Sequence, residues 1–211
     1  MVTMTVPSFP PEFPWEPSRP EPRRDPLDLP QRGPQEGPSA ADLLFDRRIV
    51  LANGWIDGEL ATDLSARLIM LDGGGDEPIA LHLRAPDADL EAAFAVADTM
   101  GILSCPVNVV VIGQAGGPAL LILAAGRSRE MTPHATLLLT EPRAESGGAA
   151  SDVAIHEEAY RRKVDAFYIR LAEVTGREVD EIRDDAREGR MFTAEQAREY
   201  GLIDAIAGNR S

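Results

Sequence analysis

A β-branched run followed at once by a tight turn and an apolar stretch constrains the fold of this chain more than any other feature. VNVVVI (107–112) is continuously apolar apart from one asparagine, and Gly116, Gly117 and Pro118 separate it from ALLILAAG (119–126). Such a run is typical of a strand that is buried on both faces of a sheet. Proline is tolerated in the first turn of a helix, so we predict a helix from Pro118 through Leu123.

From Arg48 onward, strand and helix patterns alternate, which predicts the α/β class with stacked β-α units rather than a sandwich. IALHLR (79–84) reads as a strand. Asp57 and Asp89 each precede a helical pattern that they are placed to cap. The residues expected to face inward are Leu60, Leu64, Leu68 and Leu71 in the first helix and Leu90, Ala93, Ala97 and Met100 in the second.

The longest helix is predicted near the C-terminus, from a Ser151 cap to a stop at Gly176. Thr193 and Gln196 have the spacing of a capping box for a final helix that ends at Gly201. The apolar stripe of the long helix consists of Tyr160, Val164, Phe167, Leu171 and Val174.

The first 38 residues contain eleven of the seventeen prolines and few aliphatic residues. Such a composition cannot build a packed core, so we predict a disordered tail at 1–38 and a single folded domain at 39–211. The tail is open to two interpretations, an interaction arm around Trp15 or an extension without a partner.

Composition narrows the function classes. The net charge of −14 and the lack of a basic stripe argue against nucleic-acid binding, since phosphates would be repelled. One cysteine excludes a disulfide framework, and neither a membrane span nor a secretory leader is evident, so we expect a cytoplasmic protein.

GGGDEP (73–78) leads into a strand and lacks a following Lys-Ser or Lys-Thr, so it predicts a loop, and we expect no cofactor and no metal.

Four segments in order resemble the proteolytic subunit family of the Clp protease. IALHLRAPDADLEAAFAVADTM (79–100) is similar to its strand, S-P-G-G loop and D-T-M helix, and IGQAGGPALLILAAG (112–126) to its nucleophile turn I-G-x-A-A-S-M-G-A. SDVAIHEEAY (151–160) resembles its T-D-I-E-I-H helix start, and FTAEQAREYGLIDAI (192–206) its closing motif F-x-S-A-x-E-A-x-E-Y-G-L-I-D. The resemblance implies the Clp protease/crotonase-like fold with a protruding handle helix, through which the family stacks two seven-membered rings.

The same resemblance places the family's catalytic residues on three positions of this chain. The nucleophilic serine falls on Gly117, the general-base histidine on Thr140 and the orienting aspartate on Gly189. A threonine hydroxyl cannot accept a proton at neutral pH as imidazole does. The two oxyanion-hole amides fall on Ala88 and Pro118, and proline has no N–H. We therefore expect no intact catalytic residue and, as a consequence, a pseudo-protease rather than an enzyme.

A relocated catalytic site is the alternative among the remaining reactive side chains. His82 lies on a predicted strand, His134 in a turn and His156 early in the long helix. No serine or cysteine stands at a plausible elbow beside them, so we expect structural histidines. Cys105 precedes a strand and is expected to be a small buried residue.

The resulting hypothesis is a non-catalytic Clp proteolytic subunit homologue that acts structurally or in regulation, in mixed rings with an active paralogue. Ala80 and His82 stand where the family carries tyrosines that help to bind the unfoldase ATPase, so docking is expected through the other subunits. The alternatives are a stand-alone adaptor that uses the proline-rich tail, a residual serine-type ATP-dependent endopeptidase, and an acyl-CoA enzyme of the related crotonase fold.

Overall fold

The computed structural model describes residues 39–143 and 153–208, and the side chains of 153–157 are not described. The predicted tail at 1–38 and the Ser151 cap therefore lie outside the described residues.

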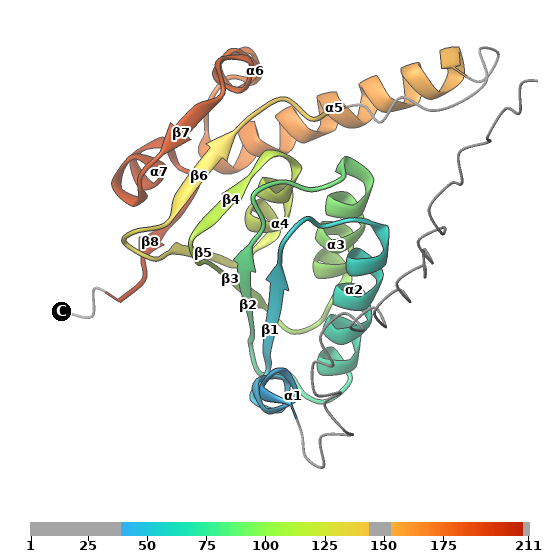
Figure 1. Cartoon of the computed structure of the whole chain (residues 1–211), viewed down its shortest axis with the longest axis vertical. Helices are drawn as coiled ribbons and strands as arrows, with labels where there is room; N and C mark the ends of the chain where they lie inside the picture. Colours follow the sequence, from blue (N-terminus) through green and yellow to red (C-terminus); the bar gives the residue numbers. More distant parts are fainter. Residues whose placement is uncertain (1–38, 144–152, 209–211) are drawn as a thin grey trace, which may run out of the picture. The chain divides into compact units, whose positions relative to one another are not determined.

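A five-stranded parallel sheet forms the centre of the fold, in the order β1-β2-β3-β5-β8 (Figure 1). A second sheet of three strands has the order β4-β6-β7, with β4 and β6 parallel and β7 antiparallel to β6. The strands are β1 Ile49–Asn53, β2 Ile79–Arg84, β3 Val107–Val111, β4 Gln114–Gly116, β5 Ser128–Met131, β6 Thr136–Leu139, β7 Arg190–Phe192 and β8 Ala205–Ile206. The predicted α/β class is confirmed.

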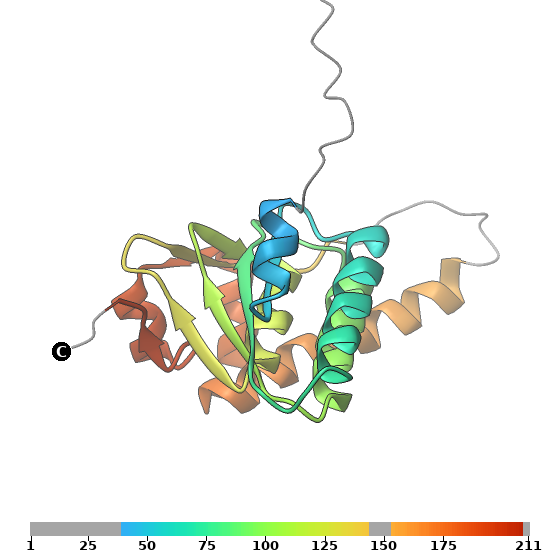
Figure 2. The same ribbon diagram turned by 90° about the horizontal axis from the view of Figure 1, so that it is seen from below.

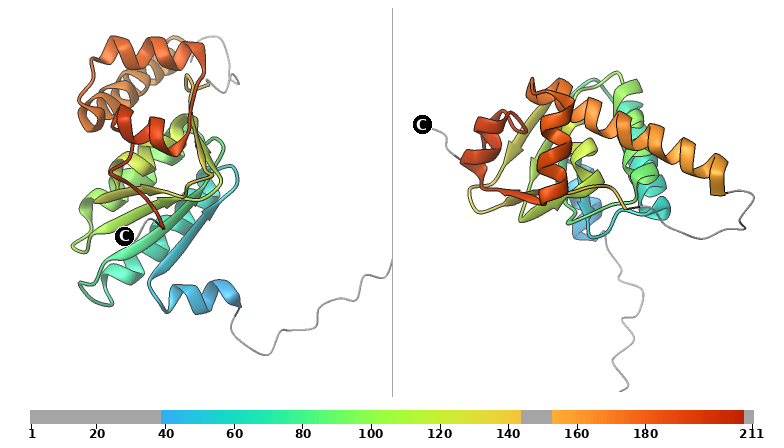
Figure 3. Two further views of the ribbon diagram at one scale, coloured as in Figure 1. Left: turned by 90° about the vertical axis from the view of Figure 1, so that its left-hand side faces the viewer. Right: turned by 90° about the horizontal axis from the view of Figure 1, so that it is seen from above.

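Helices α2 and α3 lie side by side against one face of the large sheet (Figure 2). Figure 3 shows α5 extending beyond the sheets, as expected for a protruding helix. The helices are α1 Ala40–Phe45, α2 Gly58–Asp72, α3 Leu90–Ile102, a 3-10 turn at Gly117–Ala119, α4 Leu120–Ala125, α5 Val153–Thr175, α6 Val179–Glu188 and α7 Ala194–Tyr200.

Of the four predicted caps, three lie in the described residues, and two of these are made as expected. The Asp57 side chain accepts the N–H of Leu60, and Thr193 forms a capping box with Gln196. Asp89 occupies the cap position of α3 but makes no side-chain cap bond, and its Oδ1 accepts the indole N–H of Trp55 at 3.0 Å. Asp89 therefore links the start of α3 to the segment after β1.

Burial differs from the prediction where only one face of an element is covered. β3 alternates buried and half-buried residues instead of being buried throughout, because the helices cover one face of the sheet. Ala97 of α3 is half-buried. In α5, Phe167 and Leu171 are fully buried, whereas Tyr160, Val164 and Val174 are only partly buried against the core. The apolar stripe of α5 therefore packs in the domain over its second half.

One ion pair ties the C-terminal edge strand to the large sheet. Arg129 Nη2 lies 2.5 Å from Asp204 Oδ1, and the Arg129 backbone N–H donates to Asp204 Oδ2 at 2.8 Å. Partial burial by itself raises the pKa of Asp204, but the hydrogen bonds and charge of Arg129 outweigh it and hold that pKa below its usual value. The ionised carboxylate is thus the form that the folded state favours.

Replacement of Asp57 by alanine should remove the α2 cap and lower the free energy of unfolding by about 1 kcal/mol, measured by chemical denaturation. Asp63→Ala on the same helix is the matched control. It removes only the exposed pair with Arg67, so a loss of about 0.3–0.5 kcal/mol is expected. Equal losses for the two variants would contradict the role of the cap.

Asp204→Asn should destabilise the protein at neutral pH and progressively less in acid. The folded-state pKa of Asp204 is depressed, so its stabilisation is present above the unfolded value of about 3.9 and is lost as the pH falls through the lower folded value. Urea denaturation of both proteins over a pH series measures the difference. A difference that stays constant into the acid range would show that the ion pair is not its source.

Candidate functional site

Three chain segments meet at one edge of the small sheet because of its strand directions. β4 and β6 run parallel, so their C-terminal ends lead to Gly117 and Thr140 at the same edge. β7 runs antiparallel to β6, with Arg190 paired to Leu139, so the residue before β7, Gly189, lies there too. The topology thus gathers the three positions that the sequence singled out.

Gly117, Thr140 and Gly189 form a row at this edge, with Thr140 in the middle. A Cβ built at Gly117 would lie 3.5 Å from Thr140 Oγ1, and one built at Gly189 would lie 3.9 Å from Thr140 Cγ2. Gly117 is buried, Thr140 half-buried and Gly189 exposed, so the row leads from the interior to the surface. The three positions are adjacent, as the members of a triad must be.

The loop between β2 and α3 closes over the row from the other side. The Gly116 N–H donates to the Ala85 carbonyl at 3.0 Å. A Cβ at Gly116 would lie 2.6 Å from the Pro86 carbonyl oxygen and 3.1 Å from Leu138 Cβ. Only glycine at 116 therefore permits this approach of two backbone segments.

Asp87 is the site residue that the sequence reasoning missed. Its Oδ1 accepts the N–H of Ala88 at 2.9 Å and lies 2.2 Å from where a Cβ of Gly117 would be. The available signal was its place in the loop A-P-D-A (85–88), next to a residue already assigned to the oxyanion hole. A charged residue there changes what the loop offers to a ligand.

The second expected amide position lies in the turn that follows β4. Pro118 is buried near the start of the 3-10 turn and has no N–H to offer, and Gly117 before it has a φ of +50°, the left-handed conformation that glycine favours. The loop hence offers the Ala88 N–H, which already donates to Asp87, and Thr140 after β6 adds its hydroxyl at the same edge.

The other reactive side chains lie elsewhere in the fold. His82 is half-buried on β2, His134 is exposed between β5 and β6, and His156 belongs to α5 with a side chain outside the described residues. Burial raises the pKa of the Cys105 thiol, and the Asp72 carboxylate raises it further. A thiol that stays protonated is a poor nucleophile, in line with the structural role expected of Cys105.

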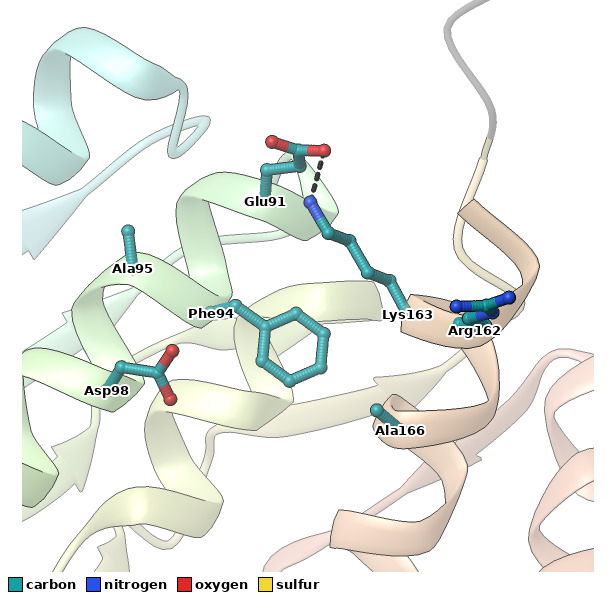
Figure 4. Close-up of a pocket in the computed structure, with 7 residues that line it drawn as sticks. All are labelled: Glu91, Phe94, Ala95, Asp98, Arg162, Lys163 and Ala166. Atoms are coloured by element: carbon teal, nitrogen blue, oxygen red, sulfur yellow. Dashed lines mark hydrogen bonds and ion pairs between the residues drawn. The ribbon is translucent and has the colours of Figure 1, made fainter. Parts of the chain in front are cut away.

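Two grooves in the described part of the chain lie away from the row. One, of about 440 Å³, opens between α3 and α5, with Phe94 and Ala166 at its centre (Figure 4). Lys163 spans it to form an ion pair with Glu91. A neighbouring groove of about 660 Å³ continues along the same helices. Neither groove is lined by any of the three row positions.

Over residues 39–143 and 153–208, no group of three or more histidine, cysteine, aspartate or glutamate side chains is arranged to hold a metal ion. Within the same ranges, every helix is too short or too polar to cross a lipid bilayer.

Comparison with known proteins gives one consistent family. The family model described as Clp protease matches residues 35–210. The chain is 32% identical over 173 residues to the ATP-dependent Clp protease proteolytic subunit 1 of Corynebacterium jeikeium, covering 80% of this chain and 91% of that protein. It is 32% identical to the proteolytic subunit 2 of Rhodococcus jostii, covering 80% and 88%, and 33% identical to the proteolytic subunit 3 of Nocardia farcinica, covering 77% and 76%.

The expectation that this chain is not an enzyme is wrong. The matching family is a protease family, and the similar proteins are named proteolytic subunits. That expectation rested on a few positions aligned by motif within a single sequence. Such an alignment identifies residue types at those positions, but it does not observe the loss of an activity.

The close approach at Gly116 gives a direct test of the site geometry. Gly116→Ala should lower the free energy of unfolding by about 1–3 kcal/mol, because its Cβ meets backbone atoms that cannot move aside independently. The control is Gly101→Ala in α3, where a Cβ meets nothing within 4 Å. It should stabilise the protein by about 0.5–1 kcal/mol through helix propensity. Two changes of the same sign in denaturation experiments would contradict the geometry.

Proposed function

The chain belongs to the Clp protease family, and from this premise we propose that it serves as a structural or regulatory subunit of a Clp-type proteolytic complex. In this role it shares a ring with a second Clp proteolytic subunit and alters assembly, gating or access of substrates. The proposed setting is protein degradation and quality control in the cytoplasm.

The observation that carries the proposal is the chemistry of the row of residues described above. We propose that Gly117, Thr140 and Gly189 correspond to the family's serine, histidine and aspartate, and Ala88 and Pro118 to its oxyanion amides. Position 117 then holds no hydroxyl, and position 118 holds no N–H. Loss of one oxyanion donor alone costs about 3 kcal/mol of transition-state stabilisation in a serine protease.

The scaffold supports a role in assembly. The small sheet of β4, β6 and β7 is complete around the three positions, and α5 extends from the domain as an assembly element would. Ala80 and His82 are half-buried on β2 and offer no large aromatic anchor, so we propose that any unfoldase ATPase docks through the partner subunits. We propose no cofactor, no nucleic acid and no membrane as a partner.

A second candidate function rests on the proline-rich tail. Eleven prolines in residues 1–38 are suited to an extended recognition arm, which would make the protein a stand-alone adaptor. Deleting residues 1–38 would then remove its binding partners, whereas a ring subunit would keep its neighbours through the folded domain.

Native mass spectrometry of the protein, tagged at its own chromosomal locus and purified from its host, tests the proposal. A particle that contains this chain together with a second Clp proteolytic subunit is the expected result, both for the full chain and after deletion of 1–38. A homomeric ring or a lone protomer would overturn the proposal of a shared ring. Partners that disappear on deletion of the tail would favour the adaptor.

A further inference from the structure

We propose that Asp87 blocks the candidate site from within the chain, and we call it the stopper. Its carboxylate occupies the space beside Gly117 and withholds the Ala88 N–H from any other acceptor. This inference rests on contacts within one chain. It therefore holds equally for a ring subunit and a free protomer, and goes beyond the proposed function.

The geometry makes the Asp87 carboxylate and a side chain at position 117 mutually exclusive. Asp87 Oδ1 would lie 2.2 Å, and its Cγ 3.1 Å, from a Cβ at Gly117. Carbon and oxygen atoms that are not bonded to each other do not approach this closely, so either the carboxylate moves or position 117 stays glycine. The φ of +50° at Gly117 adds a second reason for glycine there.

Movement of the carboxylate has its own cost. Ala88 is only 4% exposed, and its N–H donates to Asp87 Oδ1 at 2.9 Å. A rotation of Asp87 away from Gly117 would leave this buried donor without its acceptor, which is unfavourable unless a new acceptor replaces it. The hydrogen bond therefore holds the carboxylate in the position where it blocks the space.

The stopper also determines what can approach the loop. An amide whose N–H already donates to a carboxylate cannot donate to a peptide carbonyl or to an anion. The negative charge of Asp87 further repels an anionic group at short range. A peptide that reaches this edge of the small sheet would have to displace Asp87 before it could use the Ala88 amide.

A double-mutant cycle between positions 87 and 117 tests the inference. Gly117→Ala should lower the folding equilibrium constant in the wild-type background. In an Asp87→Ala background the factor by which this constant falls should be about tenfold smaller, because the carboxylate is gone. If Gly117→Ala alone fails to fold, its rescue by Asp87→Ala supports the stopper. An equal cost in both backgrounds would overturn it.

Gly176→Ala is the matched control. Gly176 also has a positive φ, +69°, but a Cβ there meets nothing within 4 Å, so this variant reports the cost of the left-handed conformation alone. Its cost should be the same with and without Asp87→Ala. A coupling of similar size at Gly176 would show that Asp87→Ala acts through general stability and would contradict the direct contact.

The single variant Asp87→Ala gives an independent readout. Amide NMR spectra should show an upfield shift of the Ala88 proton and about tenfold faster hydrogen exchange at that amide, since its acceptor is removed. Amides of β1 and β3 serve as internal references, and their exchange should not change. An Ala88 amide with unchanged shift and exchange would overturn the inference even if all variants fold.

Discussion

The site depends on the close approach of the loop at 85–88 to the turn at Gly116 and Gly117. Carbonyl oxygens and side chains of the loop lie where a Cβ at either glycine would be, so the two segments fit only because these residues lack side chains. The small sheet then adds Thr140 from β6 and Gly189 before β7 to the same edge. The backbone contact at Gly116 and the Asp87 side chain beside Gly117 together fix the site.

The architecture could be predicted from the sequence because local signals agreed with one another. The Asp57 cap, the strand at 79–84 and the capping box at Thr193 are each encoded within a few residues, and all are present. Burial was less predictable. Whether Val110 of β3 or Val174 of α5 is covered depends on which elements pack over them, and residue type and spacing do not contain that information.

The correspondence of the candidate site to a catalytic triad stays a prediction. Motif order placed Gly117, Thr140 and Gly189 in one site, and the structure brings them together. Asp87 was overlooked because its role depends on a contact between the β2–α3 loop and the turn after β4, which are remote in sequence. The step from residue types to the loss of enzymatic function was wrong. The family match and the similar proteins support a proteolytic subunit. The contribution of this chain to proteolysis has to be measured on the whole complex.

The most direct test of this account is to place a photo-crosslinking residue at the exposed position Ile169 of α5 in the native complex and to identify the product by mass spectrometry. The account predicts a cross-link to a second Clp proteolytic subunit. Cross-links that form only to copies of this chain would contradict it.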